Sequence, residues 1–164
     1  MKKSFLLEGL EIEGDKCQIF SIKFDGEESN EFEKYLLKYE TSHKKIINSI
    51  VTRLELMKKR NGCLDIFFNL EVSSIYNSLC RLKETKTLRL YCIRFGNVAL
   101  ILGGGGIKPD DIRTYQEVPE LNEEVDRLSY VYEKILDKIK EKEIKITNTG
   151  LEGDLYIKIE ENDE

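Results

Sequence analysis

Basic and aromatic side chains gather in the middle of the chain, where they could bind a phosphodiester. From Arg81 to Lys108 there are six basic residues and one acidic residue, although the whole chain of 164 residues carries a net charge of −5. Fixed cations stabilise the charge that develops in a phosphodiester transition state, and this chemistry needs neither a metal nor a histidine. We therefore take Arg89 and Lys108 as candidate catalytic cations, with Tyr115 or Lys108 as the candidate for proton transfer.

The remaining candidates for contact with a nucleic acid lie in or beside the same region: Arg81, Lys83, Tyr91 and Arg94. Residues 117–164 carry 7 basic and 15 acidic groups. The basic region could therefore be a solvated positive face that pairs with this acidic end. Both interpretations stay open at this point.

The hydrophobic pattern from residue 75 to residue 102 has a period of two, which is typical of strands. One face receives the apolar positions Cys80, Leu82, Leu88, Leu90 and Cys92, and the other receives Arg81, Lys83, Arg89 and Tyr91. Residues 98–102 are apolar throughout, as in a strand that is buried on both faces. The pattern predicts an antiparallel sheet with one apolar face and one basic, solvent-facing surface.

Two amphipathic helices precede this sheet and are expected to cover its apolar face as an antiparallel pair. In the first helix Phe32, Tyr35, Leu36 and Tyr39 share one stripe, and Ser29 or Asn30 can cap its start. Residues 46–57 keep the helical spacing in the second, with Thr41 or Ser42 as the N-cap and Asn61-Gly62 as the stop.

Further elements are predicted at both ends of the chain. Residues 4–12 and 16–24 surround Glu13-Gly14-Asp15 and predict a hairpin. A long amphipathic helix is predicted to begin at Pro119 and end near Lys142. Residues 144–146 and 155–159 flank Asn148-Thr149-Gly150 and predict a closing hairpin. The length of the chain favours one domain, residues 1–164.

Several other chemistries lack the spacing that they need. The four cysteines are far apart without a C-x-x-C pair, and the one histidine, His43, is expected at the surface, which argues against a zinc site and a catalytic triad. Gly103-Gly104-Gly105-Gly106 runs into Ile107-Lys108-Pro109 rather than into a phosphate-loop motif, so we expect these glycines to leave room for strand twist, a neighbouring chain or a ligand. We find no cofactor motif.

The N-terminal apolar run is too short for a signal peptide, and no stretch is long enough to span a membrane. We therefore expect a cytoplasmic protein with reduced thiols and no membrane partner.

The order of two helices, an antiparallel sheet, the segment Leu88-Arg89-Leu90-Tyr91, then Lys108 and Tyr115 resembles the RelE/HigB-like toxins of bacterial type II toxin–antitoxin systems. The similarity covers about residues 16–116, leaving an extra N-terminal hairpin and the extension 117–164. It implies an α+β fold with a twisted antiparallel sheet packed on a helical hairpin, plus a long C-terminal helix.

The resemblance implies a ribosome-dependent mRNA endoribonuclease that needs no metal or other cofactor. Arg89 and Arg81 would hold the phosphate, Lys108 would stabilise the developing charge, and Tyr115 or Lys83 would move the proton. The alternative is a non-catalytic interaction module that binds a small helix-turn-helix antitoxin or forms a homodimer. The acidic extension and the open sheet edge motivate this alternative. Fold similarity alone does not assign a reaction, so both hypotheses remain.

Overall fold

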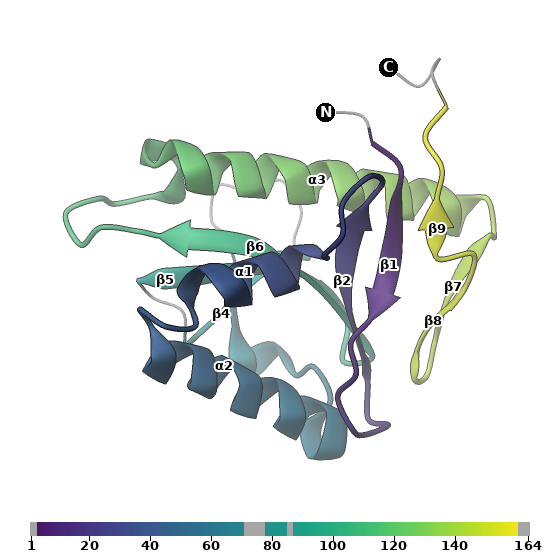
Figure 1. Ribbon diagram of the computed structural model, residues 1–164. Coiled ribbons are helices and arrows are strands. Elements are labelled where there is room, and N and C mark those ends of the chain that lie inside the picture. The colour runs from purple at the N-terminus through teal and green to yellow at the C-terminus, as the bar shows by residue number, and fades with distance from the viewer. Residues whose placement is uncertain (1–2, 71–77, 85–86, 161–164) are drawn as a thin grey trace.

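The computed structural model describes residues 3–70, 78–84 and 87–160, and these form a mixed α+β structure with a mostly antiparallel sheet and three α-helices (Figure 1). The strands are β1 (Phe5–Gly9), β2 (Gln18–Phe24), β3 (Phe68–Leu70), β4 (Leu79–Leu82), β5 (Leu88–Phe95), β6 (Ala99–Ile107), β7 (Ile144–Thr147), β8 (Gly150–Gly153) and β9 (Tyr156–Ile157). The helices are α1 (Glu31–Tyr39), α2 (Lys44–Leu56) and α3 (Pro119–Lys140), with short helices η1 (Met57–Asn61), η2 (Asp65–Phe67) and η3 (Tyr115–Glu117).

The main sheet has the strand order β3-β4-β5-β6-β2-β1-β9, while β7 and β8 form a separate hairpin. Its neighbours are antiparallel except for β2 and β6, which run parallel with Gln18 opposite Ala99 and Ser21 opposite Leu102. The expectation of a purely antiparallel sheet is therefore wrong at this pair. A parallel pair needs a long crossover connection, and the chain from β2 through α1, α2 and three further strands provides it.

Both predicted terminal hairpins exist, but the second differs in its partner strand. β1 pairs with β2, with Phe5 opposite Phe24, as predicted. β7 pairs with β8 and not with residues 155–159, because Gly150 (φ 154°) lets the return strand begin directly after a short turn. The later residues form β9 on the edge of β1, where the buried side chains of Phe5 and Ile157 are directly opposite each other.

The start of α1 follows the sequence prediction, whereas the start of α2 does not. Asn30 caps α1: its side chain accepts a hydrogen bond from the Glu33 N–H at 2.8 Å, and the Glu33 carboxylate accepts one from the Asn30 N–H. The N-cap of α2 is His43, which makes no capping hydrogen bond with its side chain, so the expected Thr41 or Ser42 cap is wrong. Ser42 Oγ instead lies 2.8 Å from His43 Nδ1.

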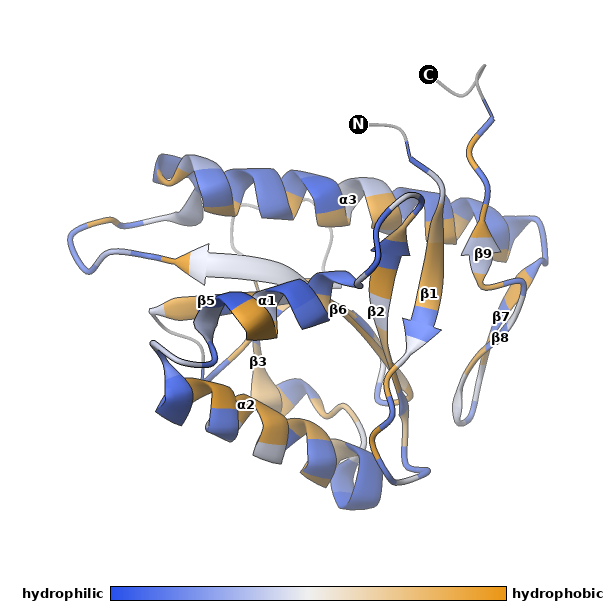
Figure 2. Cartoon of the chain, viewed as in Figure 1, coloured by the Kyte–Doolittle hydropathy of each residue, from blue (hydrophilic) through white to orange (hydrophobic). Residues whose placement is uncertain are grey.

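Helices cover both faces of the sheet, with α3 on one face and the α1–α2 pair on the other (Figure 1). The predicted alternation is confirmed, because Cys80, Leu82, Leu88, Leu90 and Cys92 all pack in the α1–α2 core. Figure 2 shows apolar residues on the side of α2 that is turned toward the sheet and hydrophilic residues on its outer side. The other core contains the buried stripe of α3: Leu121, Val125, Leu128, Val131 and Ile135.

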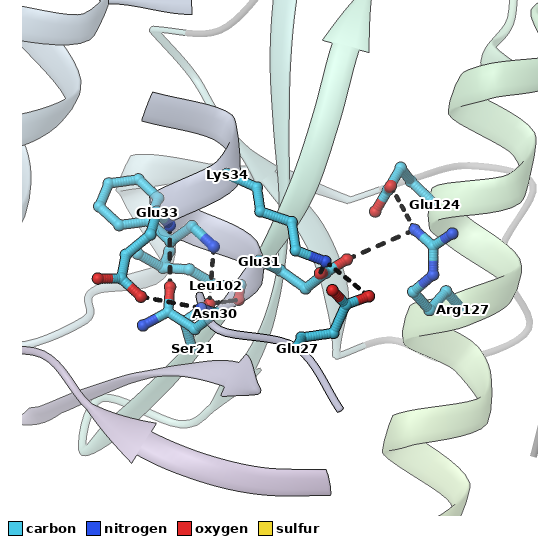
Figure 3. Close-up of polar contacts among 10 residues, drawn as sticks. Ser21, Glu27, Asn30, Glu31, Glu33, Lys34, Leu102, Glu124 and Arg127 are labelled. Atoms are coloured by element: carbon cyan, nitrogen blue, oxygen red, sulfur yellow. Dashed lines mark hydrogen bonds and ion pairs between the residues drawn. The ribbon is translucent and has the colours of Figure 1, made fainter. Parts of the chain in front are cut away.

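A buried hydroxyl joins β2, β6 and α1 (Figure 3). Ser21 Oγ donates a hydrogen bond to the Leu102 carbonyl at 2.7 Å and accepts one from the Phe32 N–H at 3.0 Å. Because the first N–H groups of a helix have no partner within the helix, Ser21 satisfies one of them and fixes α1 against the parallel strand pair.

Candidate functional site

Three of the candidate residues meet on the face of the sheet that α3 covers. Arg89 and Tyr91 are two residues apart on β5, so their side chains share a face, and Arg89 Nη1 donates a hydrogen bond to the Tyr91 hydroxyl at 3.2 Å. The rings of Tyr91 and Tyr115 meet edge to face with centroids 6.2 Å apart. The structure thus brings together a guanidinium group and two phenols, which is a set of groups suited to binding a phosphate.

This cluster of Arg89, Tyr91 and Tyr115 is closed to solvent. The exposed fractions of the three residues are 7%, 1% and 4%. The expectation that this face of the sheet forms a solvent-facing basic surface is therefore wrong for these residues. The physical reason is the amphipathic stripe of α3, which buries its apolar side chains on the same face.

The other candidates lie around the cluster or far from it. Arg81 is directly opposite Tyr91 on β4 and is half-buried on the same face. Lys83 and Lys108 follow the ends of β4 and β6 at the same end of the sheet, where the Lys108 N–H donates to the Thr87 carbonyl. Lys83 is exposed, whereas Lys108 is half-buried.

Arg94 lies at the opposite end of β5 and on the opposite face of the sheet. Its Nε donates to the Cys63 carbonyl and its Nη2 to Asn97 Oδ1, both at 2.7 Å. Its guanidinium also lies 5.9 Å from the centroid of the Phe68 ring. Arg94 is therefore not brought together with Arg89, and its hydrogen bonds link β5 to the chain that follows η1.

The four glycines of β6 leave room for α3, and two of them show this directly. A Cβ atom on Gly103 would lie 2.9 Å from Leu128 Cδ1, and one on Gly104 would lie 2.9 Å from Glu124 Oε2. The pairing of β5 and β6 also shifts between Leu90 and Cys92, which is a bulge opposite these glycines. The glycine run is a helix-packing surface, and the neighbour that the sequence left unspecified is α3 of the same chain.

A charged network joins α1 and α3 beside this glycine run (Figure 3). Arg127 forms ion pairs with Glu124 and with Glu31, the latter at 3.6 Å, and Lys34 pairs with Glu31 at 2.9 Å. Burial raises the pKa of Glu124, although Arg127 and the Gly104 N–H oppose this effect. The network holds the two helices together and makes Glu124 sensitive to the charge of Arg127.

Replacing Arg127 by Gln is expected to lower the free energy of unfolding by about 1–3 kcal/mol at pH 7, since two poorly solvated carboxylates lose their shared cation. Without Arg127 the folded-state pKa of Glu124 rises further, so the deficit shrinks as the pH falls toward that pKa and grows again as the pH rises through it. Urea unfolding at neutral and acidic pH measures both effects. The matched control is Arg113→Gln, an exposed arginine, and an equal deficit at both pH values would contradict the role of Glu124.

A second surface whose side chains could bind a ligand lies on the outside of α2. None of its residues was predicted as a site residue from the sequence. We define the α2 outer face by four exposed residues of α2, Lys45, Asn48, Ser49 and Thr52, and by the exposed Lys59 of η1. The exposed Glu55 follows Thr52 by one helical turn and is the acidic residue beside them. Three residues of this face line a shallow hollow of about 390 Å³ with Arg53, Leu56 and Glu84. Arg53 is held there by Glu84, whose Oε1 lies 2.7 Å from Arg53 Nε.

The charge of this region differs from that of the rest of the protein. Residues 44–61 contain six basic side chains and one acidic side chain, a net charge of +5 in a chain of net charge −5. Counting over residues 1–60 hides this excess, because 12 basic and 11 acidic groups nearly cancel there. A count over α2 and η1 together, residues 44–61, would have found it.

Comparison of the chain with models of known families, with characterised proteins and with solved structures gives no match. Among the described residues, no helix has the length and apolarity needed to cross a membrane. Within the same residues, no group of three or more His, Cys, Asp or Glu side chains could hold a metal ion. The two candidate functional features of the described residues are therefore the α2 outer face and the covered cluster of Arg89, Tyr91 and Tyr115.

Proposed function

We propose that this protein is an RNA-binding, non-catalytic member of the RelE/HigB-like group of type II toxin–antitoxin proteins. The α2 outer face carries the proposal, because it places exposed lysines beside amide and hydroxyl groups within residues 44–61, a segment with six basic side chains and one acidic side chain, Glu55. Lysine, Asn, Ser and Thr side chains are the groups that contact a phosphodiester backbone in a sequence-independent way.

An RNA partner fits this surface better than a membrane does. A helix that lies on a membrane needs large apolar side chains on the face that it inserts. On the outer side of α2 the exposed large apolar residue is Val51, with an exposed fraction of 37%, and the other exposed positions are polar or charged, including the acidic Glu55. The ribosome and its messenger RNA are therefore the partners that we favour.

The arrangement of the helices is the observation that supports the proposed family. The α1–α2 pair packs on one face of the sheet, as the resemblance over residues 16–116 implies. The extension 117–164 adds α3 to the other face. A small antitoxin with a helix-turn-helix domain is the protein partner that this assignment implies, with a homodimer as the alternative association.

The binding proposal is tested with the purified full chain and a fluorescently labelled single-stranded RNA. The double variant Lys45→Glu/Lys59→Glu should weaken binding at least about tenfold. It should also reduce the slope of log Kd against log salt concentration by about 1.4, since two phosphate contacts are lost. Fluorescence anisotropy gives both quantities.

The control carries the same change of charge elsewhere on the surface. Lys140 and Lys145 are exposed and lie outside α2, so Lys140→Glu/Lys145→Glu should retain nearly all of the affinity. Equal losses in the two double variants, or no binding by the parent chain, would overturn the proposal.

The second candidate function is the ribosome-dependent mRNA endoribonuclease, and the meeting of Arg89, Tyr91 and Tyr115 favours it. RNA could reach this cluster only if α3 moved away from the sheet, because the cluster is nearly inaccessible beneath it. The proposal therefore expects that expression of the parent chain leaves bacterial growth and the 5′ ends of messages unchanged. Growth arrest with new cleavage sites, lost in Arg89→Lys and in Tyr115→Phe, would establish the nuclease instead.

A further inference from the structure

Arg53 lies in the hollow beside the α2 outer face, and two other residues hold its side chain in place. Its Nε donates a hydrogen bond to Glu84 Oε1 at 2.7 Å, which joins α2 to the turn after β4. Its guanidinium carbon lies 4.3 Å from the centroid of the Phe67 ring in η2, within the range of a cation–π contact. Because one edge of the guanidinium group is bonded and one plane lies against a ring, this side chain has little freedom to rotate.

These contacts leave the terminal nitrogens of Arg53 available to a ligand. Within the part of the chain that the structure describes, no acceptor bonds Nη1 or Nη2 of Arg53, and Glu84 Oε2 has no hydrogen-bond partner. The ion pair therefore uses the Nε–H group alone. The Arg53 side chain keeps 30% of its surface exposed and lines the hollow, so its terminal N–H groups are open to a ligand there.

Uncharged donors lie beside the guanidinium group in the same hollow. Asn48 and Thr52 lie one helical turn apart on the same side of α2 and line the hollow together with Arg53. Amide and hydroxyl groups donate hydrogen bonds to phosphate oxygens, and a guanidinium group does so with a planar fork of N–H groups. Ser49 is not one of these donors, because its hydroxyl already donates to the Lys45 carbonyl at 3.0 Å.

A phosphate within an RNA strand fits this hollow better than an isolated anion does. The hollow is shallow and open, so a small anion would be held by little more than one guanidinium group. In a strand, the neighbouring phosphates contact the exposed Lys45 and Lys59, and these contacts raise the local concentration of the phosphate at Arg53. The net charge of +5 over residues 44–61 favours such a polyanion.

We propose that this hollow binds one phosphodiester group of a single-stranded RNA, with the terminal N–H groups of Arg53 as its main donors. Glu84 and Phe67 are positioning residues that aim the guanidinium group. The inference rests on the proposed RNA-binding function and adds the contact that orients the strand. Flexible lysines neutralise phosphates without fixing their direction, whereas a held guanidinium fork accepts a phosphate in one orientation.

The experiment measures binding of the full chain to a fluorescently labelled oligouridylate by anisotropy at several salt concentrations. Arg53→Lys keeps the positive charge and loses the planar fork. It should weaken binding at least about tenfold, while the slope of log Kd against log salt concentration stays that of the parent. Arg60→Lys is the matched control at an exposed arginine of η1, and it should bind within about twofold of the parent.

Glu84→Ala separates positioning from charge. The variant removes a negative charge beside the hollow, so electrostatics alone predicts tighter binding of RNA. Loss of the ion pair that holds Arg53 predicts the opposite sign, and we expect binding at least about threefold weaker than that of the parent. Phe67→Leu changes no charge and should weaken binding as well. Thermal unfolding of each variant establishes that it is folded.

A measurement on the parent chain needs no variant. The Nε–H resonance of Arg53 should shift in the NMR spectrum when the oligouridylate is added, and an unshifted resonance at saturation would overturn the inference. If Arg53→Lys and Glu84→Ala bind like the parent while Lys45→Glu/Lys59→Glu binds weakly, the hollow is not a phosphate site and the RNA-binding function stands. If the parent chain does not bind the oligouridylate, the proposed function and the inference fail together.

Discussion

A chain that ends at Gln116 is expected to lose cooperative unfolding. This truncation removes α3, whose five buried core residues have exposed fractions of 4% or less: Leu121, Val125, Leu128, Val131 and Ile135. Burial of such side chains contributes about 1.5–3 kcal/mol each, or about 7–15 kcal/mol together. The whole stability of a domain is of the order of 5–15 kcal/mol, so the truncated chain has too little left to fold. Thermal unfolding followed by circular dichroism measures the result.

The control for this truncation is a chain that ends at Glu160, which keeps α3 and all described strands and should unfold cooperatively like the parent. The comparison also separates two roles for the extension. If the chain that ends at Gln116 folds and cuts RNA, α3 is a removable cover over a nuclease site. If it is unfolded, α3 is part of the core, and the burial of Arg89 and Tyr115 is a permanent feature of the fold.

The secondary structure could be predicted from the sequence because each element carries its own periodicity. The alternation in residues 79–92 correctly separated Cys80 and Leu82 from Arg81 and Tyr91. The apolar stripe of α3 was also predicted from the helical spacing of its apolar residues. A single sequence does not predict which face of the sheet each amphipathic helix covers. The apolar stripe of a helix can pack against any apolar face of a sheet.

That missing information explains the error at the candidate site. A face with Arg81, Lys83 and Arg89 looks polar when strands are considered alone, and only α3 shows that its neighbours Tyr91 and Ile93 belong to a second core. The parallel β2–β6 pair was unpredictable for a similar reason. Strand order depends on contacts between residues that lie about 80 positions apart in the chain, such as Ser21 and Leu102.

The cysteines are a further case in which the sequence did not predict a long-range contact. Their wide spacing lacks the short-range motif of a zinc site. Tertiary contacts nevertheless place Cys17 beside Cys63 and Cys80 beside Cys92. The spacing of cysteines in the sequence therefore shows whether a local motif is present. It does not predict which distant cysteines become neighbours in the folded sheet.

Replacing Gly105 by Ala is expected to destabilise the protein by about 3 kcal/mol or more. A Cβ atom at this position would lie 1.8 Å from the Arg89 carbonyl oxygen and 3.2 Å from the Leu90 Cα atom. These are backbone atoms of the paired strand β5, so the clash is relieved only by separating β5 from β6. For a chain of this size the loss corresponds to a decrease in Tm of roughly 6–12 °C, which thermal unfolding measures.

Two other glycines show that the effect is specific to this contact. Gly9→Ala is the matched control in a strand, since a Cβ atom there meets no heavy atom within 4 Å, and its stability should differ from the parent's by less than about 1 kcal/mol. Gly104→Ala should fall between the two, because its nearest contact is the end of the Glu124 side chain, which can rotate away. Equal stability of Gly105→Ala and Gly9→Ala would mean that β5 can withdraw from β6 without loss.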